Sequence, residues 1–164
     1  MEDTLLDKET IDIMEFRIQQ EHHSSRLYHA MELWFKDRGY NNLAKLYSKY
    51  VEDELVHMKW AESFLLDYNL KPKLKALPSP EMEFETPMDI FEETLLHEKL
   101  VTKQVEELTG FALSKKNFVL YALGLKYCAE QQEELGKSWD IISVAKLTND
   151  MLVLDNYIGE NYLD

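Results

Sequence analysis

Residues 43–64 read LAKLYSKYVEDELVHMKWAESF. Spacings of alternately four and three residues, the period of a helix that buries one face, select a mostly apolar stripe from this stretch. The stripe consists of Leu43, Tyr47, Tyr50, Glu54, His57, Ala61 and Phe64. Glu54 and His57 lie three residues apart, so both side chains project from the same face of the expected helix. A carboxylate in the middle of a buried stripe requires compensation of its charge.

Three other segments carry a stripe of the same kind, each with one glutamate near its middle. The first stripe consists of Ile11, Met14, Ile18, Glu21, Ser25 and Tyr28. The next consists of Met88, Phe91, Leu95, Glu98, Thr102 and Val105. The last consists of Leu120, Gly124, Tyr127, Gln131, Glu134, Ser138 and Ile141. The periodicity therefore predicts an all-α protein built on four long amphipathic helices.

Residues typical of helix ends predict where these helices begin and end. We expect them over residues 8–37, 42–69, 87–113 and 118–146, with a short fifth helix over residues 151–161. Gly39 is a stop signal, and Asn41 or Asn42 is a candidate cap of the second helix. Thr86 and Pro87 are typical of the start of a third helix, and the segment 148–150 can cap the fifth.

The lengths of the connections predict how the helices are arranged. The first and third connections span only a few residues, so each joins antiparallel neighbours. The second has about 17 residues and can reach roughly 55 Å, while a helix of about 28 residues is roughly 42 Å long. It can therefore run the length of the bundle. We expect residues 1–164 to form a single domain, a four-helix bundle with one long crossover and a short C-terminal fifth helix.

Composition excludes several classes of protein. The 164 residues carry a formal net charge of −13, which repels phosphate backbones, so we expect no nucleic-acid partner. The sole cysteine, Cys128, cannot form an internal disulfide and indicates a reducing compartment. No targeting segment and no run long enough to cross a bilayer is apparent. We therefore expect a soluble, cytoplasmic protein without a membrane partner.

The four central glutamates are expected to meet. Glu21, Glu54, Glu98 and Glu134 each lie roughly 22–28 Å from the nearest short turn, at 1.5 Å of rise per residue. In a bundle of this length all four fall near the same middle layer. Four buried carboxylates without compensation cost several kcal/mol each, and bound cations would neutralise them. Together with the imidazole of His57, they suit two iron or manganese ions.

Simpler interpretations compete with this one. A lone glutamate in an apolar stripe commonly marks a solvated edge, and we prefer that interpretation for Glu32, near a helix end. A purely structural bundle, whose polar stripe only sets the register, is a further alternative. Tyr28 is either a core residue or a redox neighbour of the metals. The remaining histidines are expected at the surface or at interfaces; they are His22, His23, His29 and His97.

Four motifs together resemble the ferroxidase centre of bacterial non-haem ferritins. They are Gln20-Glu21-His22-His23-Ser24-Ser25 followed by Tyr28, Asp53-Glu54-Leu55-Val56-His57-Met58, His97-Glu98-Lys99-Leu100 and Glu130-Gln131-Gln132-Glu133-Glu134. Their spacing is similar to that of the family without a gap, and the resemblance extends from about Thr10 to the C-terminus.

The resemblance implies a role for each matching residue. Glu21, Glu54 and His57 would hold a first iron, while Glu98 and Glu134 would hold a second, with Glu54 bridging the two. Gln131 would help to orient bound oxygen species, and Tyr28 matches the tyrosine beside the diiron centre. These are the expected catalytic residues.

The resemblance also implies a third, cage-side iron site. Asp53, Glu130 and Glu133 match its ligands, although the family usually has a glutamate where this chain has Asp53. We therefore expect a weaker third site. No haem is expected, because bacterioferritin-like proteins carry a haem-ligating methionine at the position of Leu55.

The function implied is that of an iron store. Such a protein would oxidise Fe²⁺ with O₂ or H₂O₂ and deposit ferric mineral inside a homo-oligomeric shell of 24 subunits. The alternative is a diiron oxidoreductase or peroxidase of the same class that does not store iron. Assembly would separate the two, because a detoxifying enzyme need not form a cage.

Overall fold

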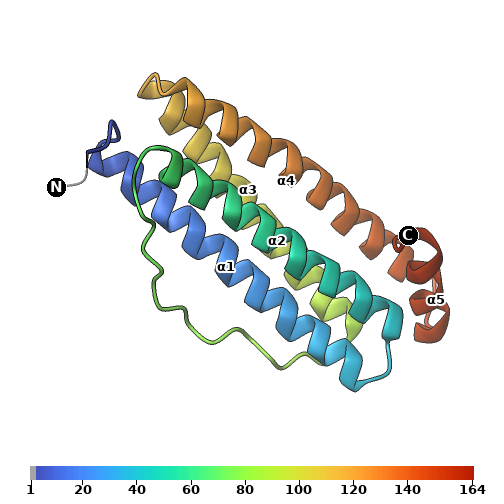
Figure 1. Ribbon diagram of the computed structural model, residues 1–164. Coiled ribbons are helices and arrows are strands. Elements are labelled where there is room, and N and C mark those ends of the chain that lie inside the picture. The colour runs from blue at the N-terminus through green and yellow to red at the C-terminus, as the bar shows by residue number, and fades with distance from the viewer. Residues whose placement is uncertain (1–2) are drawn as a thin grey trace. The chain divides into compact units, whose positions relative to one another are not determined.

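The computed structural model describes residues 3–164, which contain five α-helices and no strand (Figure 1). Residues 3–82 form one compact unit and residues 83–162 another. In the first unit, α1 (Lys8–Asp37) packs against α2 (Asn41–Asp67). In the second, α3 (Pro87–Ser114) packs against α4 (Phe118–Ala145), and α5 (Met151–Asn161) follows. Each unit is thus built on one antiparallel helical hairpin.

Both hairpins turn through the same kind of backbone cap. After α1, Gly39 has a φ of 82°, and the next amide, of Tyr40, donates to the carbonyl oxygen of Phe35 at 3.0 Å. After α3, Lys116 has a φ of 55°, and the amide of Asn117 donates to the carbonyl oxygen of Ala112 at 3.0 Å. This left-handed cap satisfies the last carbonyls of a helix and reverses the chain within a few residues.

The predicted cap of the second helix is wrong. Neither Asn41 nor Asn42 is the N-cap; that position is held by Tyr40, without a side-chain hydrogen bond. The carbonyl oxygen of Tyr40 already accepts from the amide of Ala44 at 2.9 Å, so the helix starts directly after the Gly39 turn. The same helix ends two residues earlier than predicted, because Asn69 adopts a φ of 60°.

The other predicted starts are confirmed. Thr86 and Asp89 form a capping box at the start of α3, with Pro87 as the first helical residue. The carboxylate of Asp150 accepts from the amides of Leu152 and Val153 at the start of α5. No helix among residues 3–164 has a stretch that is both long and apolar enough to cross a membrane.

The connection after α2 contains neither helix nor strand over residues 70–84. It leaves the end of α2 beside the start of the chain, where the side-chain amide of Asn69 donates to the carbonyl oxygen of Asp3 at 2.9 Å. Further on, Nε2 of Gln19 donates to the carbonyl oxygen of Ala76 at 3.2 Å. The segment therefore runs back along α1, as the expected crossover requires (Figure 1).

Burial follows the predicted stripes. Every stripe position on α2 and α4 is buried, and so are five of the six on α1 and three of the six on α3. The exceptions are half-buried; they are Ile11, Met88, Leu95 and Thr102. The four central glutamates are among the buried residues, with at most 7% of their surface exposed.

Gly124 on α4 lies close to Thr109 on α3. A Cβ added to Gly124 would clash with Oγ1 of Thr109 and come within 3.0 Å of its Cα. We predict that Gly124→Ala destabilises the protein by about 1–3 kcal/mol, because the two helices have to separate. Chemical denaturation followed by circular dichroism measures this.

Gly110 on α3 provides the matched control. A Cβ there meets nothing within 4 Å, so Gly110→Ala should stabilise the helix by about 0.5–1 kcal/mol. Equal stability of the two variants would show that the contact with Thr109 does not require a glycine.

Candidate metal centre

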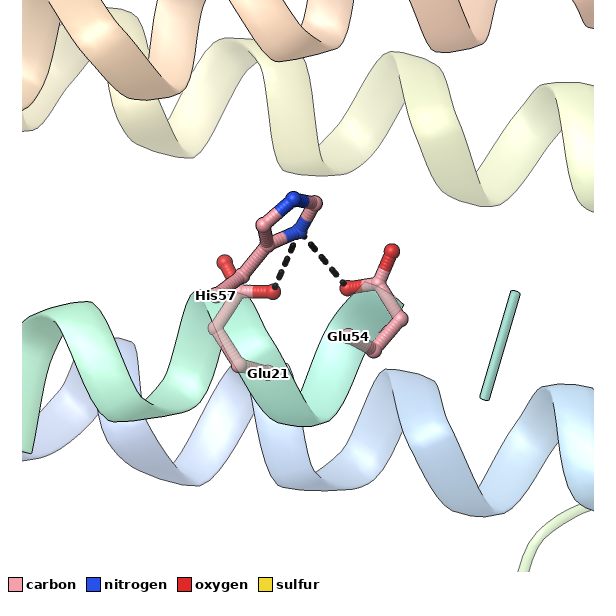
Figure 2. A group of neighbouring side chains, drawn as sticks. All are labelled: Glu21, Glu54 and His57. Atoms are coloured by element: carbon pink, nitrogen blue, oxygen red, sulfur yellow. Dashed lines mark ion pairs between the residues drawn. The ribbon is translucent and has the colours of Figure 1, made fainter. Parts of the chain in front are cut away.

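Three potential metal ligands converge inside the first hairpin. Glu21 projects from α1, whereas Glu54 and His57 project from successive turns of α2 (Figure 2). Nδ1 of His57 lies 3.9 Å from Oε2 of Glu21 and 3.7 Å from Oε2 of Glu54. One ligand atom from each residue lies within 4.8 Å of the other two. Within residues 3–164 this is the only group of three acidic, cysteine or histidine residues that meets this distance.

The cluster fits a cation. All three side chains are buried, and two of them are carboxylates. Oε2 of Glu21 is buried and has no hydrogen-bond partner among the described residues. A buried carboxylate oxygen without a donor is costly, and a cation is the partner that two carboxylates and an imidazole accommodate together. Iron(II) accepts this set of oxygen and nitrogen ligands.

One aromatic side chain packs on the cluster, and others pack together on the same two helices. The ring of His57 lies against that of Trp60, with the centroids 4.8 Å apart. Tyr28 is 1% exposed and packs against Tyr47 and Tyr50, with ring centroids 6.0 and 5.7 Å apart. Core packing, one of the two expected roles of Tyr28, is therefore observed. The redox role stays a prediction.

Three further predicted ligands lie on the second hairpin. Glu98 projects from α3, while Gln131 and Glu134 project from α4, and all three are buried. Nε2 of Gln131 donates to Oε2 of Glu98 at 2.7 Å and lies 3.3 Å from Oγ1 of Thr102. An amide donor thus holds the Glu98 carboxylate in place. Oε1 of Glu134 accepts from Nζ of Lys137 at 3.3 Å.

Each of the three candidate ligands of the third site lies one residue before a predicted residue of the diiron centre, on the same helix. Asp53 and Glu130 are half-buried, on α2 and α4, and Glu133 is exposed on α4. Lys137, four residues after Glu133, pairs with Glu134 and not with Glu133. A third site stays a prediction.

Sequence reasoning missed one charged residue of the cluster. Arg17 on α1 is 1% exposed, and its Nε lies 2.9 Å from Oε1 of Glu21. The signal was its position four residues before Glu21, which places it on the same face of the helix.

His97 is also buried, at 8% exposure, although we expected it at the surface or at an interface. Glu32 is likewise buried and pairs with Lys36 at 3.2 Å.

The sequence of the chain is similar to known proteins over most of its length. Residues 11–146 match the family described as Ferritin-like domain. The chain is 26% identical over 157 residues to a probable bacterial non-heme ferritin-like protein of Haemophilus influenzae, covering 96% of this chain and 89% of the relative. It is 25% identical over 158 residues to a bacterial non-heme ferritin of Campylobacter jejuni, covering 94% and 95%.

Solved structures are similar over the same length. An open pore ferritin from Archaeoglobus fulgidus matches with a TM-score of 0.89 and 27% identity, over 93% of this chain and 96% of that one. A humanized archaeal ferritin matches with a TM-score of 0.90 and 27% identity, over 93% and 95%. These likenesses confirm the predicted fold class, a ferritin-like four-helix bundle with a short C-terminal helix.

We predict that His57→Ala weakens Zn²⁺ binding to the iron-free protein by at least about tenfold at one site, because loss even of an indirect supporting group costs about 10–100-fold. Zn²⁺ is a suitable probe because it accepts the same ligands and is not oxidised. Isothermal titration calorimetry under metal-free conditions measures the affinity.

His29→Ala is the matched control, since His29 is exposed on α1 and lies outside the cluster. It should bind Zn²⁺ as the wild type does. If His57→Ala also leaves every Zn²⁺ site unchanged, the imidazole is not a ligand.

Proposed function

Because the chain belongs to the ferritin-like domain family, we propose that it is an iron-storage ferritin with ferroxidase activity. The observation that carries this proposal is the buried group of Glu21, Glu54 and His57, in which two carboxylates and an imidazole converge and Oε2 of Glu21 has no hydrogen-bond donor among the described residues. Fe²⁺ is the substrate, and two iron ions bind to each subunit. No haem takes part.

Each half of the ligand set has a defined task. Glu21 and His57 bind the first iron from opposite helices of one hairpin. Glu98 and Glu134 bind the second, and Glu54 bridges the two ions. Gln131 fixes the orientation of Glu98 before the metal arrives and then offers its amide to bound oxygen species. Support for the first of these roles is the 2.7 Å hydrogen bond from Nε2 of Gln131 to Oε2 of Glu98.

The chemistry is an electron transfer from iron to an oxidant. Each Fe²⁺ gives up one electron, and the two electrons reduce O₂ to H₂O₂, or H₂O₂ to water, with uptake of protons. The carboxylates stabilise the Fe³⁺ product, which prefers hard oxygen ligands. With a net charge of −13, the protein also attracts cations and favours nucleation of ferric mineral on its acidic surface.

A third iron binds beside this centre, at Asp53, Glu130 and Glu133. Asp53 is one methylene shorter than the usual glutamate, and metal–ligand distances tolerate only about 0.2 Å. This site is therefore weaker than the other two.

The subunits assemble into a shell. Large apolar side chains are exposed on the isolated chain, among them Trp139 on α4 and Leu152 and Val153 on α5, at 49%, 69% and 54%. Apolar surface of this kind is covered when subunits associate. Residues 1–164 act as a single domain in a 24-subunit cytoplasmic cage, with Fe²⁺ and O₂ or H₂O₂ as its partners.

Glu54→Ala should lower the initial rate of Fe²⁺ oxidation by at least about tenfold, because the proposed bridge affects both ions. The metal-free variant should fold and be no less stable, since one of two neighbouring buried carboxylates is removed. Stopped-flow absorbance of ferric products and chemical denaturation measure the two quantities.

Glu52→Ala on the same helix is the control, because Glu52 is exposed and its loss changes the net charge equally. An unchanged oxidation rate in Glu54→Ala would refute its assignment. A large loss of stability without metal would point to a structural role for Glu54.

The storage proposal predicts the size of the particle. Twenty-four chains of 19.4 kDa give about 470 kDa, which light scattering can measure. After aerobic loading with Fe²⁺, each particle should hold many more iron ions than its ferroxidase ligands can bind. A monomer or dimer at all concentrations, with iron limited to those ligands, would instead support the non-storing oxidoreductase or peroxidase.

A further inference from the structure

A permanent positive charge is buried beside the proposed iron site. The side chain of Arg17 is 2% exposed and that of Glu21 is 1% exposed, and Nε of the first lies 2.9 Å from Oε1 of the second. The contact is an ion pair but not a hydrogen bond, because Nε has no hydrogen-bond partner among the described residues. Nη2 of Arg17 is likewise buried and without a hydrogen-bond partner within residues 3–164.

Such a residue requires an explanation. Arginine is almost never fully buried unless it is paired, and its guanidinium does not lose its proton in proteins. The charge beside Glu21 is therefore present at every pH at which the protein functions. Two of the buried nitrogens make no directed hydrogen bond, so the side chain is held mainly by its charge and not by a complete set of bonds.

Glu21 divides its two oxygens between two partners. Oε1 faces the guanidinium, whereas Oε2 faces the cluster, 3.9 Å from Nδ1 of His57. Part of the carboxylate charge that a metal would use is thus already neutralised. A cation bound through Oε2 would therefore share the Glu21 carboxylate with a fixed positive charge.

We propose that Arg17 is a permanent counter-ion of the iron site, which compensates Glu21 when no metal is bound and lowers the affinity for the metal that does bind. The proposal rests on the proposed function. Coulomb repulsion scales with the charge of the bound ion, so Arg17 penalises Fe³⁺ more than Fe²⁺. The site then favours departure of the oxidised product over its retention.

On the second hairpin, the cation seen beside a proposed ligand is of another kind. Lys137 pairs with Glu134 there, but 40% of its side chain is exposed, so it can move into solvent when a cation arrives. Arg17 has no such route, because its whole side chain is enclosed. The effect on metal affinity therefore belongs to Arg17 in particular.

The test compares metal affinities of iron-free protein. Zn²⁺ is titrated by calorimetry and Tb³⁺ by luminescence into the wild type and Arg17→Gln, and the relevant site is the one that His57→Ala weakens. Arg17→Gln should bind Zn²⁺ at least about tenfold more tightly, and Tb³⁺ by a larger factor, because a repelling unit charge is gone. The metal-free variant should also unfold at a lower temperature, since Glu21 has lost its partner.

Two further variants separate charge from shape. Arg17→Lys keeps the charge and should bind both metals within about threefold of the wild type. Arg26→Gln removes an exposed arginine from the same helix and should change nothing. If metal-free Arg17→Gln does not fold, Zn²⁺ should restore its helical circular dichroism, because the metal replaces the missing counter-ion.

The outcomes discriminate sharply. If the wild type binds Zn²⁺ and Arg17→Gln binds it no more tightly, Arg17 is a packing residue and the inference fails while the proposed function stands. The inference also fails if Arg17→Lys behaves like Arg17→Gln, or if Zn²⁺ does not restore an unfolded Arg17→Gln. If the wild type binds neither metal at a site that depends on His57, the proposed function falls and the inference with it.

Discussion

Compensation of buried carboxylate charge is the constraint on which the rest of the structure depends. Each long helix carries one glutamate inside an otherwise apolar stripe, and each of these side chains is at most 7% exposed. An ion in such a place costs several kcal/mol unless an opposite charge or a donor accompanies it. The guanidinium of Arg17 and the amide of Gln131 supply part of that compensation, and a cation bound by Glu21, Glu54 and His57 would add to it. The proposed iron binding and the packing of the helices therefore depend on the same arrangement.

The hairpins make this arrangement possible because they fix the register of facing helices. A left-handed cap at Gly39 in one hairpin and at Lys116 in the other reverses the chain within a few residues. With turns this short, a ligand on the incoming helix is brought level with one at a similar distance along the outgoing helix. Glu21 and Glu54 meet for this reason, although they are far apart in the sequence. Glu98 and Gln131 meet in the same way, at 2.7 Å.

Much of the fold can be predicted from the sequence, since helical periodicity depends only on which residues are apolar. The stripes and the extent of α1 agree with the prediction, and Glu21 and His57 lie beside Glu54 as expected. The grouping of Glu98 and Glu134 with Glu54 stays a prediction. The burial of Arg17 was not predicted, because the stripe contains Ile18, three residues before Glu21, and not the charged residue four before it. A buried helical face is more than about 100° wide, so it includes both positions. The cap at Tyr40 was missed because backbone geometry, and not a side chain, provides it.

Charge compensation differs between the two hairpins, and that difference bears on function. In the first hairpin a guanidinium that cannot leave or lose its proton neutralises one oxygen of Glu21. In the second, a neutral amide orients Glu98 and a half-exposed lysine accompanies Glu134. A neutral amide orients a ligand without opposing a cation, and a mobile lysine can withdraw from one. A fixed guanidinium opposes every cation and the more highly charged one most, which suits a site that must pass its product on.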